Sequence, residues 1–322
     1  MKKINVSAPG KLMLFGEHAV VYNHPCIVTA VSERIHATVE ILDSHMFELD
    51  APDVLITNYK KELSKLGTGE IPKGAKFVEF AVKNISEKYS ITNGVKVTTH
   101  SDFSSEFGFG SSSATTVCIV KAFSEIFDLK LTNKDIFDIS YKTVIDIQSK
   151  GSGFDVAAAT YGGTLYFLTG GIIIEPLLIS SFPLIVGYTG IKADTVTLIN
   201  SVKDLYQTNP KIVEGIYESI DFLTNSAKEE ITAKSWQTVG VLMNENHKLL
   251  SALGVSIPKL DSMITAAIAA GAYGAKLSGA GGGDCMIALA PLDKTKDIED
   301  AITNVGGSIL KVDTHAKGVT VE

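Results

Sequence analysis

The sequence is poor in cysteine and tryptophan, with three cysteines and one tryptophan among 322 residues. Cys26, Cys118 and Cys285 are far apart and have apolar neighbours. Three isolated cysteines do not make a disulfide framework, and the absence of a CxxC pair argues against a structural zinc site. We therefore expect three buried, reduced thiols and a location in the reducing cytoplasm.

Long apolar runs and positive charge are also scarce. No run reaches the roughly 18–20 apolar residues that cross a bilayer, and no apolar segment of signal-peptide length follows the charged N-terminus. The 29 Lys and Arg residues are outnumbered by 36 Asp and Glu, which gives a net charge of −7. Because nucleic-acid binding requires a basic surface, we expect neither nucleic acid nor membrane as a partner. An anionic ligand must then be held by backbone dipoles, a few cations or a metal ion.

What is present is enough apolar sequence for a packed core, since 45% of the residues are hydrophobic and 20% are charged. Strand and helix patterns occur throughout, which predicts an α+β protein. A Gly- and Pro-bounded stretch, residues 170–183, is the candidate junction between two domains, which we place at residues 1–172 and 173–322.

Hydrophobic periodicity predicts the individual elements. Before the junction, we expect strands at 4–16 (interrupted by Pro9 and Gly10), 26–42, 94–100 and 162–168, and helices at 77–89, 112–127 and 134–148, the last capped by Asn133. After it, we expect strands at 184–188, 275–278, 285–290, 308–312 and 318–321, and helices at 194–206, 211–225, 232–253, 258–270 and 294–303.

A glycine- and serine-rich loop runs directly into an apolar helical segment. We call it the phosphate loop; it consists of Gly108, Phe109, Gly110, Ser111, Ser112, Ser113 and Ala114. Backbone N–H groups and the helix dipole at such a junction make a seat for phosphate, and serine hydroxyls can ligate Mg²⁺. The loop lacks the lysine of a P-loop, the third glycine of a dinucleotide fingerprint and the GxSxG of a hydrolase. An ordinary helix N-terminus is the alternative interpretation.

Two ionisable residues stand in unusual local contexts. Asp155 follows Gly151-Ser-Gly-Phe, where a rigidly held carboxylate could approach a hydroxyl group, although this segment taken alone favours a helix-capping aspartate. Lys11 lies in an apolar strand, where a lysine is costly unless it is paired. A Lys11–Asp155 pair near a γ-phosphate would stabilise a developing alkoxide.

Two further segments bear on the site. Residues 276–284, the third glycine segment, contain four glycines, which is more than a tight strand-to-strand turn requires, and they allow close backbone approach to a ligand. Glu17 and His18 follow the first strand close to Lys11, so substrate contact is plausible for them, with surface or core residues as the alternative.

Together these segments resemble the three signature motifs of the GHMP small-molecule kinases, the group of galactokinase, homoserine kinase, mevalonate kinase and phosphomevalonate kinase. The motifs are residues 8–22, 108–114 and 277–284, in the family's order along the whole chain. Residues 16–22 and 186–192 resemble mevalonate kinases, whereas residues 151–159 and 279–285 look more like phosphomevalonate kinases.

The resemblance implies a GHMP kinase fold, with an N-terminal domain like domain 2 of ribosomal protein S5 and a ferredoxin-like C-terminal domain. It implies ATP and Mg²⁺ as cofactors, the phosphate loop as the ATP site, Asp155 as catalytic base and Lys11 as its cationic partner. Ser112 would ligate Mg²⁺, and Asp146 is the nearest acid for a second ligand. The implied substrate-binding residues are Glu17, His18, Gly279, Ala280 and Gly281.

The expected activity is ATP-dependent phosphorylation of the primary hydroxyl of (R)-mevalonate to 5-phosphomevalonate, in isoprenoid precursor biosynthesis. Three alternatives stay open: a phosphomevalonate kinase, a non-catalytic nucleotide-binding sensor, and a related decarboxylase. The approach to the phosphate loop contains Asp102 and Glu106 and no cation, which favours an unphosphorylated substrate, although Lys150 and Lys192 could supply charge. A homodimer is compatible with the sequence.

Overall fold

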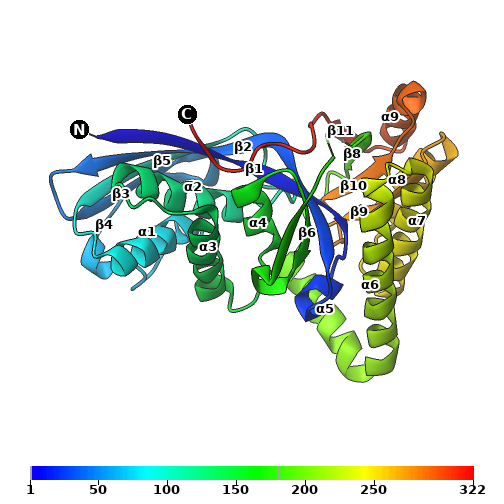
Figure 1. Cartoon of the computed structure of the whole chain (residues 1–322), viewed down its shortest axis with the longest axis horizontal. Helices are drawn as coiled ribbons and strands as arrows, with labels where there is room; N and C mark the ends of the chain where they lie inside the picture. The colour runs from blue at the N-terminus through cyan, green and yellow to red at the C-terminus, as the bar shows by residue number, and fades with distance from the viewer. Residues whose placement is uncertain (1, 180–181) are drawn as a thin grey trace.

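The computed structural model describes residues 2–179 and 182–322, which form two β-sheets, each covered by helices (Figure 1). The larger sheet, within these residues, has eight strands in the order β12-β1-β2-β5-β3-β4, with β6 added to β2 and β7 added to β6. Its strands are β1 Lys3–Phe15, β2 Cys26–Leu42, β3 Met46–Ala51, β4 Ile56–Glu62, β5 Gly94–Ser101, β6 Thr164–Leu168, β7 Ile173–Leu177 and β12 Thr320–Val321.

The predicted interruption of the first strand is present as an irregularity in the β1–β2 pairing. Pro9 lies opposite Arg34, but Lys11 lies opposite Ala30, so the register shifts between them. Proline has no N–H to donate to a ladder, which is why it accompanies such a shift. The backbone N–H of Lys11 instead donates to the carbonyl of Phe109, 2.9 Å away. The irregularity thus joins β1 to the phosphate loop.

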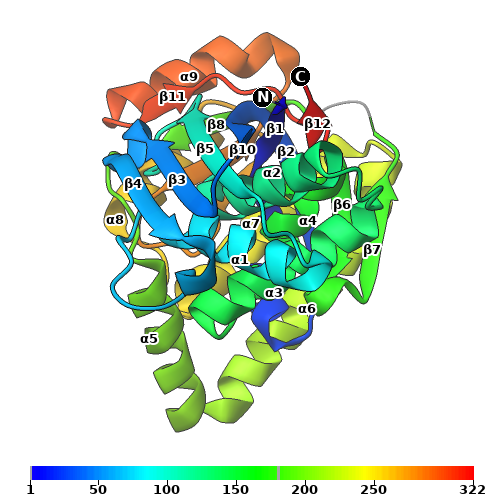
Figure 2. The same cartoon turned by 90° about the vertical axis from the view of Figure 1, so that its left-hand side faces the viewer.

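Four helices cover one face of the larger sheet (Figure 2). They are α1 Lys76–Tyr89, α2 Ser111–Ile126, α3 Asn133–Gln148 and α4 Phe154–Tyr161. α2 and α4 pack directly on β1 and β2, and α1 and α3 pack against α2. Because α2 and α4 both lie on β1, their N-termini bring the phosphate loop and Asp155 to the strand that carries Lys11.

The smaller sheet has the order β11-β8-β10-β9 in the described part of the chain. Its strands are β8 Leu184–Tyr188, β9 Gly274–Ser278, β10 Cys285–Leu289 and β11 Ser308–Leu310, and the accompanying helices are α5 Thr195–Thr208, α6 Pro210–Thr232, α7 Trp236–Ala252, α8 Pro258–Ala269 and α9 Thr295–Asn304. Helices α6, α7, α8 and α9 contribute apolar side chains to a second core. Ile220, Leu250, Met263 and Ile298 are among its residues.

The division at residue 172 stays a prediction. Strand pairing carries the larger sheet slightly past it, because β7 pairs with β6, and β12 returns from the C-terminal end of the chain to pair with β1. Figure 1 shows the two termini close together at this sheet. Ser180 and Ser181, in the predicted junction, lie outside the described residues.

Two local expectations were wrong in detail, and one hairpin was missed. Thr132, not Asn133, caps α3, in a reciprocal capping box with Asp135. α6 continues to Thr232 instead of ending at 225, because Asn225 stays in the helix and bonds back to Asp221. The hairpin of β3 and β4 was not predicted.

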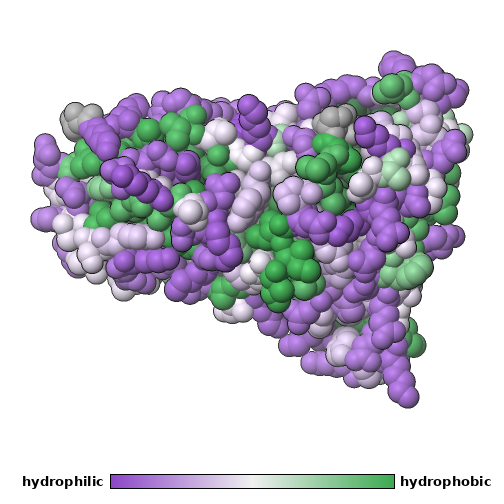
Figure 3. All heavy atoms as spheres, viewed as in Figure 1, coloured by the Kyte–Doolittle hydropathy of each residue, from purple (hydrophilic) through white to green (hydrophobic). Residues whose placement is uncertain are grey.

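The three cysteines are buried and free, as expected. Among the described residues, no helix combines the length and apolarity needed to cross a bilayer. The face shown in Figure 3 is largely hydrophilic along the outer helices, with apolar groups interspersed.

Candidate active site

The phosphate loop forms the N-terminus of α2. Gly110 is the N-cap residue with φ +76°, and Gly108 has φ +72°; both values favour glycine. The helix begins at Ser111, so its first amide groups point out of the helix end together with the positive end of its dipole. This geometry is suited to binding phosphate.

Lys11, Gly110 and Asp155 are in close proximity. A methyl group added at Gly110 would lie 3.3 Å from Cε of Lys11 and 3.5 Å from Cβ of Asp155. The structure therefore brings together the lysine and the carboxylate that the sequence suggested as partners, on either side of a glycine. Their charged groups bond to other partners, Lys11 to the carbonyl of Gly108 and Asp155 to the hydroxyl of Ser113.

The Lys11 ammonium group is buried, with 9% of the residue exposed. Its Nζ donates to the carbonyl of Gly108 at 2.7 Å and lies 5.4 Å from the centre of the Phe154 ring. Burial lowers the pKa of Lys11, and the negative charge of Asp155, followed by that of Asp284, opposes this effect. The two carboxylates thus favour the charged form of Lys11 against the effect of burial.

Asp155 lies in the first turn of α4 and is held at both oxygens. The hydroxyl of Ser113 donates to Oδ2 at 2.6 Å, and the N–H of Val156 donates to Oδ1 at 3.0 Å. The N-cap of α4 is Gly153, so the alternative interpretation of Asp155 as the capping residue is wrong. The bond from Ser113 was not expected, because the two residues are 42 positions apart and only the packing of α2 beside α4 brings them together.

The third glycine segment lies against the phosphate loop. A methyl group at Gly108 would lie 2.5 Å from Oδ2 of Asp284, and the thiol of Cys285 donates to the carbonyl of Phe107. Asp284 also accepts a hydrogen bond from the N–H of Ala193 at 2.8 Å. Burial raises the pKa of Asp284. Two glycines of the segment serve for close approach, because a methyl group at Gly281 or Gly283 would lie 2.1 Å or 2.4 Å from a neighbouring backbone carbonyl oxygen.

His18 contacts this segment, and Glu17 is enclosed beneath it. Nε2 of His18 lies 2.9 Å from the carbonyl oxygen of Ala280, so this nitrogen carries a proton and donates it, and burial lowers the pKa of His18. Glu17 is completely buried and forms an ion pair with Lys276, a residue to which we assigned no role from the sequence. Contact between Glu17 and a substrate would require its carboxylate to move.

Asp146 lies on α3, away from these contacts. Its carboxylate accepts hydrogen bonds from Lys142 at 2.5 Å and from Asn84 at 2.9 Å, and neither partner belongs to the phosphate loop. Within residues 2–179 and 182–322, no group of three or more His, Cys, Asp or Glu residues is arranged to hold a metal ion. Of the two predicted Mg²⁺ ligands, Ser112 lies in the phosphate loop, whereas Asp146 belongs to a separate contact between α1 and α3.

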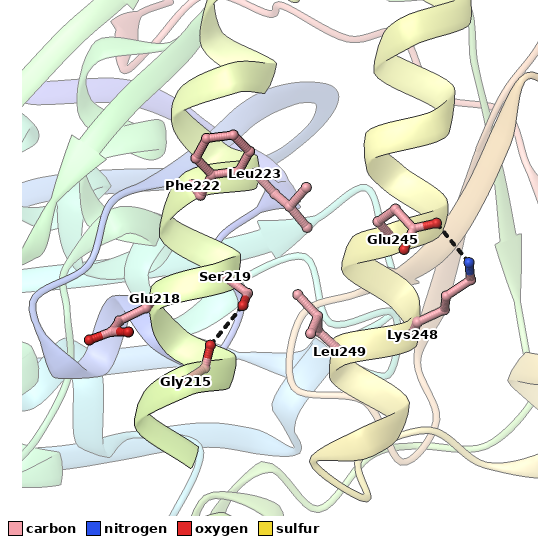
Figure 4. A pocket seen from close by; sticks show the side chains of 8 residues that line it. All are labelled: Gly215, Glu218, Ser219, Phe222, Leu223, Glu245, Lys248 and Leu249. Carbon is pink, nitrogen blue, oxygen red and sulfur yellow. Dashed lines mark hydrogen bonds and ion pairs between the residues drawn. The ribbon is translucent and has the colours of Figure 1, made fainter. Parts of the chain in front are cut away.

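A groove of about 490 Å³ between α6 and α7 holds none of the predicted residues (Figure 4). It is lined by Gly215, Glu218, Ser219, Phe222, Leu223, Glu245, Lys248 and Leu249. The candidate active site is instead the region where the three motifs contact one another.

Comparison with known proteins agrees with this assignment. The GHMP kinases N terminal domain model matches residues 76–163, and the GHMP kinases C terminal model matches residues 227–307. A mevalonate kinase of Pyrococcus abyssi is 36% identical over 98% of this chain and 97% of its own length. The mevalonate kinase of Saccharolobus solfataricus is 32% identical over 89% of this chain and 90% of its own.

Solved structures show the same fold. The mevalonate kinase of Methanococcus jannaschii superposes with a TM-score of 0.83 at 26% identity and covers 98% of this chain and 99% of its own. An L. major mevalonate kinase in complex with R-mevalonate gives a TM-score of 0.78 at 25% identity, over 98% and 96% of the two chains. The chain belongs to the GHMP kinase family, and its curated relatives at this level of identity are mevalonate kinases.

Proposed function

We propose that this chain transfers the γ-phosphoryl group of ATP to the primary hydroxyl of (R)-mevalonate, giving 5-phosphomevalonate and ADP. The observation that carries the proposal is the meeting of Lys11, Asp155 and the phosphate loop around Gly110, in a chain whose curated full-length relatives are mevalonate kinases. Phosphoryl transfer needs positioning and charge stabilisation more than covalent chemistry, and these residues supply both.

Each residue then has a defined task. The amide groups at the start of α2 bind phosphate oxygens, and the Lys11 ammonium offsets negative charge between phosphate and alcohol. Asp155, fixed by Ser113, orients the substrate hydroxyl and takes its proton as the new O–P bond forms. The low exposure of Lys11 strengthens these charge interactions, because less water screens them.

The residues of the loop also fit Mg²⁺. Mg²⁺ takes few protein ligands and keeps water and phosphate oxygens, so one hydroxyl group at the loop is sufficient on the protein side. The side chain of Ser112, in the first turn of α2, would be this ligand. When bound, the ion would neutralise charge on the phosphates. Asp146 remains a candidate second ligand only if its contacts with Lys142 and Asn84 break.

The alcohol end of the site is proposed to include His18, Gly279, Ala280 and Gly281. Gly279 has φ +96° with open space where a side chain would stand, so a ligand can approach its backbone. His18 is 8% exposed and donates to Ala280, which places a neutral imidazole between the first motif and this backbone.

Phosphomevalonate is the alternative acceptor, since residues 151–159 and 279–285 resemble phosphomevalonate kinases. An ADP-release assay with mevalonate, 5-phosphomevalonate, galactose and homoserine decides between the acceptors. We expect turnover with mevalonate well above the other three. Preference for 5-phosphomevalonate would replace the proposal, and nucleotide binding without ADP release on any acceptor would support the sensor.

A further inference from the structure

The ion pair between Lys276 and Glu17 is unusual in its complete burial. Both side chains have 0% exposure, and Nζ of Lys276 also donates to the carbonyl of Leu277 at 2.7 Å. Removing two charges from water is expensive, and well-packed apolar residues often stabilise a fold at least as well. Stability alone is therefore a weak explanation for an ion pair at this position.

Other hydrogen-bonded contacts accompany the ion pair between the first motif and the third glycine segment. Ser278 donates to the carbonyl of Met13 at 2.9 Å and accepts from its N–H at 3.1 Å, and His18 contacts the carbonyl of Ala280. Residues 276 and 278 are two positions apart in β9, so their side chains lie on the same side of the strand. That side faces the end of β1, the strand that carries Lys11.

Glu17 depends on Lys276 for its place. Oε2 of Glu17 has no hydrogen-bond partner among the described residues, and Oε1 forms the ion pair, so the ammonium group of Lys276 compensates the buried charge. Burial raises the pKa of Glu17, and the charge of Lys276 opposes this effect. Without the ammonium group, the carboxylate would be buried and uncompensated, so it would take up a proton or move, and either change alters the contacts of the Glu17–His18 turn.

We propose that Lys276 is a positioning residue for phosphoryl transfer: acting through Glu17, it holds His18 and the backbone of residues 279–281 in place relative to Lys11. The expected effect on kinetics rests on the proposed function. The expected effect on structure rests only on the contacts described above. Lys276 does not touch the reacting atoms, because its buried ammonium group donates to the carboxylate of Glu17 and to the carbonyl of Leu277.

The kinetic test compares Lys276→Met, Glu17→Gln and the double variant. We expect Lys276→Met to lower kcat/KM for mevalonate about 10- to 100-fold, mainly through KM for the alcohol, because small misplacements at a reacting centre have effects of this size. In the Glu17→Gln background, Lys276→Met should change kcat/KM by less than about twofold, because the residue acts through Glu17. A further tenfold loss in that background would overturn the proposal. If the Lys276→Met single variant does not fold, the comparison of Glu17→Gln with the double variant still tests the proposal.

The control is Lys61→Met. Lys61 pairs at 2.7 Å with Glu79, another fully buried glutamate, in the β4–α1 region. Both lysine variants should lower the Tm, but only Lys276→Met should raise KM. Equal KM values in the two folded variants would leave Lys276 with a structural role only and would overturn the proposal.

Hydrogen exchange separates this inference from the proposed function. In full-length protein without substrate, Lys276→Met should accelerate amide exchange at least tenfold in residues 16–18 and 279–283, and leave α2 unchanged. Unchanged exchange in both segments would reject the positioning role, even in a protein that phosphorylates mevalonate. Faster exchange in a protein that phosphorylates no alcohol would reject the proposed function, but it would support the role of Lys276 in holding these two segments in place.

Discussion

The hydroxyl of Ser113 donates a hydrogen bond of 2.6 Å to Oδ2 of Asp155. Ser113 is 2% exposed, so water does not compete for this bond, and the N–H of Val156 holds the other carboxylate oxygen. A residue of the phosphate loop thus fixes the orientation of the proposed base. In the proposed mechanism, the helix turn that binds the nucleotide would also position the base.

Replacing Ser113 by alanine should lower kcat about 10- to 100-fold and leave KM for ATP nearly unchanged. Hydrogen bonds to charged groups contribute about 1.5–3 kcal/mol, and each 1.36 kcal/mol is a factor of about ten in rate. Steady-state kinetics on both substrates measures the effect. Ser140→Ala is the control, because that buried hydroxyl lacks a partner among the described residues. Equal kcat values in the two variants would show that Ser113 does not position the base.

Asp155→Asn should reduce turnover by about 10²–10⁴-fold, the usual contribution of a general base, while the protein still binds ATP. The amide keeps the shape of the carboxylate but cannot accept the hydroxyl proton. Calorimetry of nucleotide binding and ADP release measure the two properties separately. Near-normal turnover would remove Asp155 from the proposed mechanism, and loss of nucleotide binding would assign it a different task.

Gly110→Ala should impair the site more than it impairs the fold. The methyl group would stand 3.3 Å from Lys11 and 3.5 Å from Asp155 and would crowd the space between them. We expect kcat/KM to fall at least tenfold for both substrates. Gly254→Ala is the matched control, because Gly254 has the same φ of +76° and nothing within 4 Å of the added methyl group. Both variants carry a strain of about 1–2 kcal/mol, measurable by denaturant unfolding, and only the first should lose activity.

Stability should fall as the pH drops below about 6.5 because of His18. Burial lowers the pKa of His18, with the hydrogen bond to Ala280 opposing, so the unfolded chain takes up a proton at a higher pH than the folded protein does. The unfolded state then binds more protons from pH 6.5 down through the folded pKa, and the free energy of unfolding decreases by at most about 1.4 kcal/mol per pH unit. No loss from this residue is expected above that range.

Denaturant unfolding at several pH values, with His18→Gln beside the parent chain, measures this slope. The variant should show a shallower decrease, and the remaining slope should come partly from His247, whose pKa burial also lowers. His100→Gln is the control, since that side chain is 68% exposed. Identical slopes in His18→Gln and the parent would contradict the assignment.

Much of the fold could be predicted because its local signals are strong. Alternation along β2, helical spacing in α1 and the glycines before α2 each depend on neighbouring residues, and all three predictions were confirmed. The β3–β4 hairpin was missed because β4 is largely exposed and its Thr-Asn-Tyr-Lys-Lys sequence has little apolar alternation. β3 of this hairpin in turn pairs with β5, which follows more than thirty residues later.

The sequence by itself determined which chemical groups are available: an amide-rich loop at a helix start, a lysine in an apolar strand and an aspartate after a glycine turn. Local backbone preferences and the cost of burying charge are sufficient to identify these groups. Only the tertiary structure decided the partners. It joined Asp155 to Ser113, enclosed Glu17 with Lys276, and bound Asp146 to Lys142 and Asn84. Except for the pair on α3, these contacts form between elements distant along the chain, where packing of helices and sheets, not local sequence, sets the distances.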